Sequence, residues 1–324
     1  MEKKVLRTGA LVIACAILLR LLSALPATTA AQVLTGPELA SLAIFLQTGR
    51  RVRLPVTVQP PPDIPVTQPE PTQAVAQPLP VTFSAQDAQL VQLNSSCSYQ
   101  PDIAASLTQP LTWELAGDAP TVLILHTHGT EAYAGQAGYR SDDSAVNVVA
   151  VGDRIATLLE EGGIRVVHDR TAHDQPSYNG SYNHARSAIG EYLAQYPTIR
   201  LVLDIHRDAA EDASGKQIDY TVETDLGDAA KLMLVVGTDA GGWEHPNWSE
   251  NLALAVKLHA LLQRNTPQIC RPISFRASRF NQDLSPGALL VEVGAAGNTQ
   301  QEALRAAELL SQSILELAWG AQGL

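Results

Sequence analysis

The stretch TVLILHTHGTEAY, residues 121–133, decides the fold prediction for this chain. Its first part, 121–126, is a largely apolar run of the kind found in strands that are covered on both faces of a sheet. The run ends at His126, and His128 and Glu131 follow directly. Because sites in open α/β sheets gather at the carboxyl ends of strands, this pattern predicts a functional site here.

Strands and helices alternate from about Ala116 to the end of the chain. Apolar residues at helical spacing predict helices over 147–163, 181–197, 249–265 and 299–318, and short apolar runs predict strands over 164–169, 200–206, 216–222, 231–237 and 288–294. This alternation favours an α/β fold with a mixed, largely parallel central sheet and helices on both faces.

The first thirty residues differ from the rest in composition. Lys3, Lys4 and Arg7 precede an apolar run over 8–27 that only Arg20 interrupts. We interpret residues 1–30 as a membrane anchor with its N-terminus in the cytoplasm. A cleaved signal peptide and a buried core helix are the alternatives. The first two interpretations both export the remainder of the chain.

Four further regions follow the predicted anchor. Residues 31–54 form a short amphipathic segment, and the proline-rich composition of 55–80 predicts an extended linker. Residues 81–115 are an ambiguous lead-in with a candidate helix over 83–93, and we expect 116–324 to form the catalytic domain.

The net charge limits the classes of partner that the chain could bind, and the cysteine count bears on disulfide bonds. The formal net charge of −11 argues against a nucleic-acid partner and against electrostatic adhesion to anionic lipid. Cys15 lies in the predicted anchor, which leaves Cys97 and Cys270 as the exported pair. One pair in so long a chain is no disulfide framework, and whether the two are bridged stays open.

Two more predicted strands carry residues of the same chemical type. Strand 200–206 ends at His206, and strand 288–294 contains Glu292 between apolar neighbours. Two imidazoles and one carboxylate make a zinc site whose fourth position is open, and a second carboxylate can transfer protons beside it. We therefore predict His128, Glu131 and His206 as zinc ligands and Glu292 as the catalytic base.

Two assignments at this predicted site stay open. Asp143 is the alternative to Glu131 as carboxylate ligand. His126 lies two residues from His128, so on a strand both would point to the same face, as a fourth contact or as support for the ligands. Each of these histidines alone would more commonly satisfy a backbone carbonyl than bind a metal.

Two polar segments could bind the substrate. The segment 169–186 contains Tyr178 and Asn179, and the segment 271–288 contains Arg279 and Asn281. With Arg207 beside His206, these are the substrate-binding candidates, since arginines hold carboxylates bidentately. A solvated connector and ion pairs within the fold are the structural alternatives.

Several stretches together resemble one known family. They are HTHGTEAY, NVVAVGDRIATLLEEGGI, HDQPSYNGSY, LVLDIHRDA, VVGTD and RFNQDLSPGALLVEVGAAGNTQQEAL, which span about residues 120–310. In these stretches the chain resembles stage II sporulation protein P of endospore-forming bacteria.

The resemblance implies a membrane-anchored, metal-dependent peptidoglycan hydrolase, an N-acetylmuramoyl-L-alanine amidase that is also credited with endopeptidase activity. It implies action in forespore engulfment together with the stage II sporulation proteins D and M. The expected location is the cell membrane, with a single span and the catalytic domain in the intermembrane space. It also implies that His128, Glu131 and His206 are zinc ligands and that Glu292 is catalytic. The alternatives are a zinc carboxypeptidase-like peptidase and a non-catalytic wall-binding scaffold.

Overall fold

The computed structural model of the protein describes residues 81–225 and 227–320. The predicted anchor, amphipathic segment and linker, 1–30, 31–54 and 55–80, lie outside the described residues. Among the helices that are described, none has the length and apolar character needed to cross a membrane.

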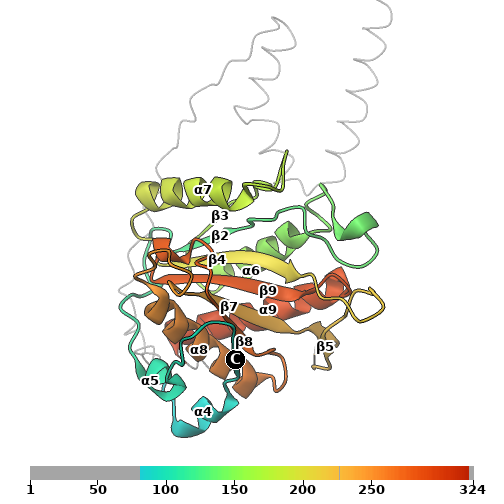
Figure 1. The fold of residues 1–324 in the computed structure, drawn as a ribbon. Coiled ribbons are helices and arrows are strands. Elements are labelled where there is room, and N and C mark those ends of the chain that lie inside the picture. The colour runs from blue at the N-terminus through green and yellow to red at the C-terminus, as the bar shows by residue number, and fades with distance from the viewer. Residues whose placement is uncertain (1–80, 226, 321–324) are drawn as a thin grey trace, which may run out of the picture. The chain divides into compact units, whose positions relative to one another are not determined.

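A seven-stranded sheet forms the centre of the domain, in the order β1-β8-β7-β9-β4-β2-β3 (Figure 1). Its strands are β1 Leu93–Ser95, β2 Val122–Leu125, β3 Val166–His168, β4 Leu201–Asp208, β7 Leu232–Gly237, β8 Ile273–Arg276 and β9 Gly287–Ala295. Neighbouring strands are parallel except for β7 and β9, which are antiparallel. The prediction of a mixed, largely parallel sheet is therefore confirmed.

Helices cover both faces of this sheet, as predicted (Figure 1). The helices are α4 Ala85–Leu90, α5 Ile103–Thr108, α6 Val148–Glu161, α7 Ser181–Gln195, α8 Trp248–Asn265 and α9 Gln300–Trp319, with short 3₁₀ turns η1 Ala137–Tyr139 and η2 Gln282–Leu284. Helix α7 lies on one face, and α6, α8 and α9 lie on the other. A separate antiparallel pair, β5 Thr221–Val222 and β6 Ala229–Ala230, stands beside the sheet.

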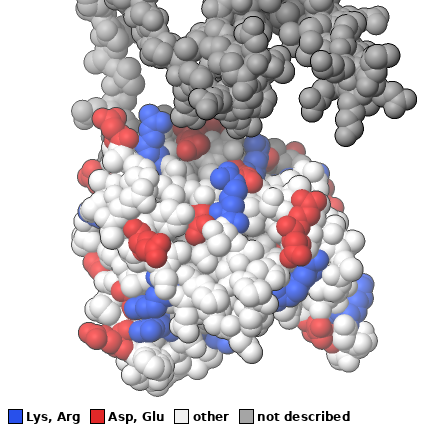
Figure 2. Space-filling view, turned by 90° about the horizontal axis from the view of Figure 1, so that it is seen from above, with Lys and Arg blue, Asp and Glu red and all other residues white. Residues whose placement is uncertain are grey.

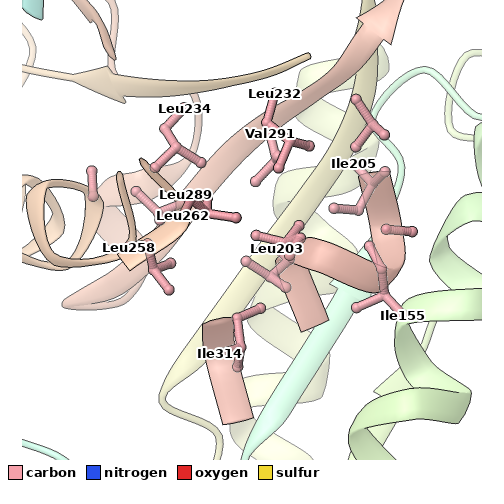
Figure 3. Packing of buried hydrophobic residues seen from close by; sticks show 14 of the residues in the cluster. Ile155, Leu203, Ile205, Leu232, Leu234, Leu258, Leu262, Leu289, Val291 and Ile314 are labelled. Carbon is pink, nitrogen blue, oxygen red and sulfur yellow. The ribbon is translucent and has the colours of Figure 1, made fainter. Parts of the chain in front are cut away.

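Two hydrophobic cores fix the direction of each side chain on β4 and β9. Leu203 and Ile205 of β4 and Val291 of β9 belong to the larger core, with α6, α8 and α9 (Figure 3). Val202 belongs to the smaller core beneath α7. Because strand side chains alternate between faces, the residues between these apolar ones project towards the α7 side. His206 and Glu292 are among them.

The lead-in segment over 81–115 contributes directly to the fold. Its helix α4 lies within the predicted range 83–93, and β1 adds an edge strand that pairs with β8. Neither β1 nor β8 was predicted, because three or four residues are too few to show a period. Cys97, which follows β1 in this region, and Cys270 are both free thiols.

The buried histidine of α8 gives a prediction about acid stability. His259 is 1 % exposed, and burial lowers its pKa to about 4. In the unfolded chain the pKa is about 6.5, so the unfolded state takes up the proton first as the pH falls. We expect the stability associated with His259 to be present above pH 6.5 and lost towards pH 4. His259→Leu should therefore show a smaller drop in unfolding free energy between pH 7 and pH 4.5 than the wild type, measured by urea denaturation. An equal drop would contradict the prediction.

Candidate active site

The site lies where β4 and β9 run side by side on the α7 side of the sheet. His206 and Glu292 are register partners in the parallel pairing of these strands, so their side chains are neighbours on one face. His128 comes from the turn that follows β2, and its ring centroid is 5.3 Å from that of His206. Three segments distant in sequence thus bring the predicted residues together.

Glu131 and Asp204 contact the two ring nitrogens of His206. Its Oε2 atom is 3.3 Å from Nδ1 of His206 and accepts a hydrogen bond of 3.2 Å from the backbone N–H of Arg207. Nε2 of His206 lies 2.9 Å from Oδ1 of Asp204, although the angle is not that of a hydrogen bond. Asp204 is held in turn by the backbone N–H and the hydroxyl of Thr127, at 2.8 and 2.6 Å. All of these side chains are buried.

The buried charges of Asp204, His206 and Glu131 stabilise one another. Burial by itself would raise the pKa of Asp204, but the charge of His206 and the hydrogen bonds from Thr127 lower it to about 2. Burial likewise disfavours the imidazolium of His206, yet its two carboxylate neighbours raise its pKa well above the ordinary value. Contact with His206 outweighs burial at Glu131 and lowers the pKa of that carboxyl. Asp204, His206 and Glu131 therefore form an alternating row of charges.

Glu292 has the opposite electrostatic character. Burial, followed by the negative charges of Glu131 and Asp208, raises its pKa to about 8 despite the attraction of His206. Its Oε2 atom is buried and makes no hydrogen bond. A carboxyl group that exchanges its proton near neutral pH is suited to general acid–base catalysis.

The donor atoms of the site fit zinc in type. Two ligands of a tetrahedral zinc, each about 2.0–2.1 Å from the metal, are roughly 3.3 Å apart. Glu131 Oε2 and His206 Nδ1 are separated by 3.3 Å, and the buried Nδ1 of His128 makes no hydrogen bond. Asp204 behind His206 would support that ring, as carboxylates do for zinc-bound histidines. Within the described residues, however, no three His, Cys, Asp or Glu side chains already surround one metal position.

Asp143 and His126, the two residues whose assignment the sequence left open, lie outside this group of side chains. Asp143 is exposed in a turn, where its Oδ1 atom accepts a hydrogen bond from the backbone of Ala145. His126 is fully buried, with Nδ1 3.0 Å from the carbonyl oxygen of Ile205 and Nε2 2.8 Å from Nε2 of His168. Because β2 ends at Leu125, strand alternation does not continue to His128, and the two imidazoles meet different neighbours.

Tyr178 lies directly over a predicted ligand. Its ring stacks on His128 at 4.3 Å between centroids and 8° between planes, and it is half exposed. The guanidinium of Arg140 lies 4.9 Å from the Tyr178 centroid and bonds to the buried carboxylate of Asp174. Asn179, the next residue, is exposed.

The three remaining substrate-binding candidates are engaged with the protein. Arg207 is buried, and its guanidinium donates to the carbonyl oxygens of Ala132 and Tyr139 at 3.0 and 2.9 Å. It thereby anchors the segment that carries Glu131. The amide of Asn281 donates to the Tyr182 carbonyl at 2.8 Å. Arg279 is part-exposed and lies 3.6 Å from a carboxylate oxygen of Asp283.

Sequence analysis missed two residues that shape the site. Asp204 precedes His206 by two positions on β4, so the period of the strand places both on one face. That signal was available in the LVLDIH run. Tyr182, whose ring centroid is 5.6 Å from that of His128, had no comparable signal because α7 and the turn after β2 meet only in the folded chain.

Comparison with known proteins agrees with the earlier resemblance. The family model of Stage II sporulation protein P (SpoIIP) matches residues 35–315. Stage II sporulation protein P of Bacillus subtilis (strain 168) is 29 % identical over 225 residues, which covers 64 % of this chain and 54 % of that protein. The chain thus spans about half the length of the curated relative that it matches.

Two solved structures show weak similarity. The N-acetylmuramoyl-L-alanine amidase AmiC2 of Nostoc punctiforme has a TM-score of 0.41 and 17 % identity, covering 62 % of this chain and 98 % of that one. The CwlD amidase of Clostridioides difficile, in complex with the GerS lipoprotein, has a TM-score of 0.39 and 14 % identity, covering 62 % and 95 %. Similarity at this level adds no argument to the geometry. The family model, in contrast, covers most of the chain and all the site residues described above, so this protein belongs to the Stage II sporulation protein P family.

Proposed function

We propose that this protein is a peptidoglycan hydrolase, a zinc-dependent N-acetylmuramoyl-L-alanine amidase. The observation that carries the proposal is the meeting of Glu131 with His206, 3.3 Å apart, beside Glu292 on the next strand. His128 completes the set at 5.3 Å between ring centroids. Membership of the sporulation family supports the same activity.

In this proposal His128, Glu131 and His206 would hold the metal. Zinc, when bound, supplies a Lewis acid that polarises the scissile amide carbonyl and lowers the pKa of a water molecule. Asp204 keeps the His206 ring in place through its contact at Nε2, which leaves Nδ1 on the side of Glu131. Arg207 fixes Glu131 from the backbone and through its bonds to the following segment.

Glu292 carries the proton transfers. In its ionised form the carboxylate, with its unpartnered Oε2 atom, accepts a proton from the attacking water, and the raised pKa of about 8 makes it a stronger base than an ordinary carboxylate. As the new C–O bond forms and the C–N bond breaks, the same carboxyl returns the proton to the departing amine of L-alanine. The products are a free lactyl carboxylate on the glycan and a peptide with a free N-terminus.

Location and partners follow as part of the same proposal. The predicted anchor over 1–30 would keep the catalytic domain outside the membrane, in the intermembrane space of the sporangium, where peptidoglycan lies. The stage II sporulation proteins D and M are the proposed partners there. On the face seen in Figure 2, acidic and basic side chains are interspersed, and that face shows no patch of one sign.

The first test removes the proton carrier. Glu292→Gln keeps the shape of the side chain but cannot exchange a proton, so wall digestion should fall by about 10²- to 10⁴-fold. Glu223→Gln, an exposed glutamate outside the site, is the control and should retain activity. The measurement is mass spectrometry of soluble fragments released from purified peptidoglycan. A new L-alanine N-terminus on intact glycan identifies an amidase, whereas cleavage within the stem peptide identifies a peptidase. Undiminished digestion by Glu292→Gln would remove this residue from the mechanism.

Glu292→Gln should lower activity but raise the free energy of unfolding at alkaline pH. The pKa of Glu292 is raised to about 8 in the folded protein, above an unfolded value of about 4.5. The folded state therefore holds the proton more tightly, and the associated stability is complete below pH 4.5 and is lost as the pH rises through 8. With a chelator present, Glu292→Gln should have a higher unfolding free energy than the wild type at pH 8, with the gain shrinking towards pH 4.5. Urea denaturation at both values measures it, and a variant less stable at pH 8 would refute the assignment.

Metal content provides an independent test. We expect the wild-type chain to retain zinc after dialysis and His206→Ala to lose it, because the site is left with two ligands. His259→Leu changes a buried histidine of α8, outside the site, and should keep its zinc, which controls for general unfolding. Elemental analysis per chain reports the outcome. Equal zinc in wild type and His206→Ala would exclude this ligand set.

A further inference from the structure

Two large apolar side chains stand exposed in the described part of the chain. They are Tyr178, 52 % exposed, and Trp243, 66 % exposed. Tyr178 stacks on His128 at the proposed active site. Trp243 lies in the loop between β7 and α8, outside that site, and the mechanism above gives it no role.

A row of side chains connects the two. The Tyr182 ring is 5.6 Å from that of His128, and the Phe280 ring is 6.1 Å from that of Tyr182. Arg279, the neighbour of Phe280 in sequence, places its guanidinium 5.2 Å from the centre of the Trp243 ring. The exposed tryptophan is therefore the outer end of a series that runs from a predicted zinc ligand through Tyr182 and Phe280 and reaches the indole by way of Arg279.

The loop that carries Trp243 is tied to the segment that carries Arg279. The backbone N–H of Gly237 donates to the Gln282 side chain at 2.8 Å, and the hydroxyl of Thr238 donates to the Arg276 carbonyl at 2.9 Å. A Cβ atom at Gly241 would overlap the carbonyl oxygen of Ala277, so the two loops touch through their backbones. Their relative position is fixed by contacts that do not involve the tryptophan.

Arg279 is itself held on the side away from Trp243. Asp283 lies 3.6 Å from its guanidinium and accepts two hydrogen bonds from Arg186 of α7, at 2.8 and 2.6 Å. Phe280 and Asn281 between them both adopt left-handed backbone conformations, with φ of 51° and 59°. Such conformations cost free energy and persist where the surrounding contacts enforce them. The surface around Trp243 is thus ordered in advance of any ligand.

We propose that Trp243, backed by Arg279, is a sugar-binding subsite that holds a ring of the glycan strand at a distance from the muramic acid being cut. The inference rests on the proposed function and extends it to the substrate's polysaccharide part. One face of a pyranose ring presents C–H groups, which pack on the electron-rich face of an indole, while the hydroxyls at its rim need donors and acceptors. The guanidinium of Arg279 lies over one face of the Trp243 ring, 5.2 Å from its centre. Trp243 therefore provides a flat apolar surface on its other face, and Arg279 provides N–H donors close by.

The glycan fits this surface better than the stem peptide does. A stem peptide carries carboxylates, for which a cation free to form a bidentate pair would be expected. The cation here, Arg279, already faces Asp283. A neutral ring with hydroxyl groups requires no further charge, and the exposed indole matches it.

The test measures binding separately from catalysis. Full-length protein with Glu292→Gln is mixed with peptidoglycan glycan strands from which the stem peptides have been removed, and the bound fraction is titrated. Adding Trp243→Ala to this background should weaken binding by about tenfold, the typical scale for losing one aromatic stacking contact. Trp243→Phe should restore most of the affinity, because it retains a flat ring. Glu244→Gln, the exposed neighbour, should bind like the parent.

A second measurement uses the active chain. Trp243→Ala should raise KM for polymeric peptidoglycan relative to KM for a muramyl tripeptide by about tenfold, since only the polymer reaches the subsite. Glycan binding unaltered by Trp243→Ala, or weakened equally by Glu244→Gln, would overturn the inference. If the wild-type chain digests no peptidoglycan, the proposed function fails, whereas the binding titration still decides whether Trp243 holds sugar.

Discussion

The parallel pairing of β4 with β9 is the constraint on which the rest of the structure depends. Its register sets His206 against Glu292, while Leu203, Ile205 and Val291 are buried on the opposite face. A slip of one residue in either strand would turn the apolar side chains out of the core and the polar ones into it. The large core therefore fixes the geometry of the site, although it contains none of the proposed catalytic groups.

The buried charged groups of this site differ in how well neighbouring charges and hydrogen bonds stabilise them. Asp204, His206 and Glu131 alternate in sign and are bonded further by Thr127 and Arg207. Glu292 is left with an unpartnered oxygen atom and a pKa of about 8. Buried carboxylates are normally hydrogen-bonded, so the unpartnered oxygen of Glu292 beside these paired charges supports its proposed role in proton transfer.

The reversed direction of β7 determines what surrounds the site. Because β7 is antiparallel to β9, the loop after Gly237 leaves the sheet at the end where β9 begins. The segment that leads into β9 starts from the same end and crosses beside α7, where Phe280 meets Tyr182. Aromatic side chains thus extend away from the proposed catalytic residues, in keeping with the polymeric substrate that we propose.

The sequence alone indicated most of the alternating elements and the α/β class, because periodicity is a local property. It also singled out His128, Glu131, His206 and Glu292 as candidates from the chemistry at strand ends, and their roles stay a prediction. The strand predicted over 216–222 is reduced to β5 Thr221–Val222, which lies outside the central sheet. The sequence could not order the strands, detect β1 and β8, or show which of Glu131 and Asp143 lies beside His206. Those depend on contacts between distant segments: Glu131 meets His206 only when the turn after β2 packs beside β4, and Asp143 remains in solvent. The tertiary structure alone decided that Arg207 supports Glu131 and that Trp243 stands exposed, since burial and partners exist only once the chain has folded.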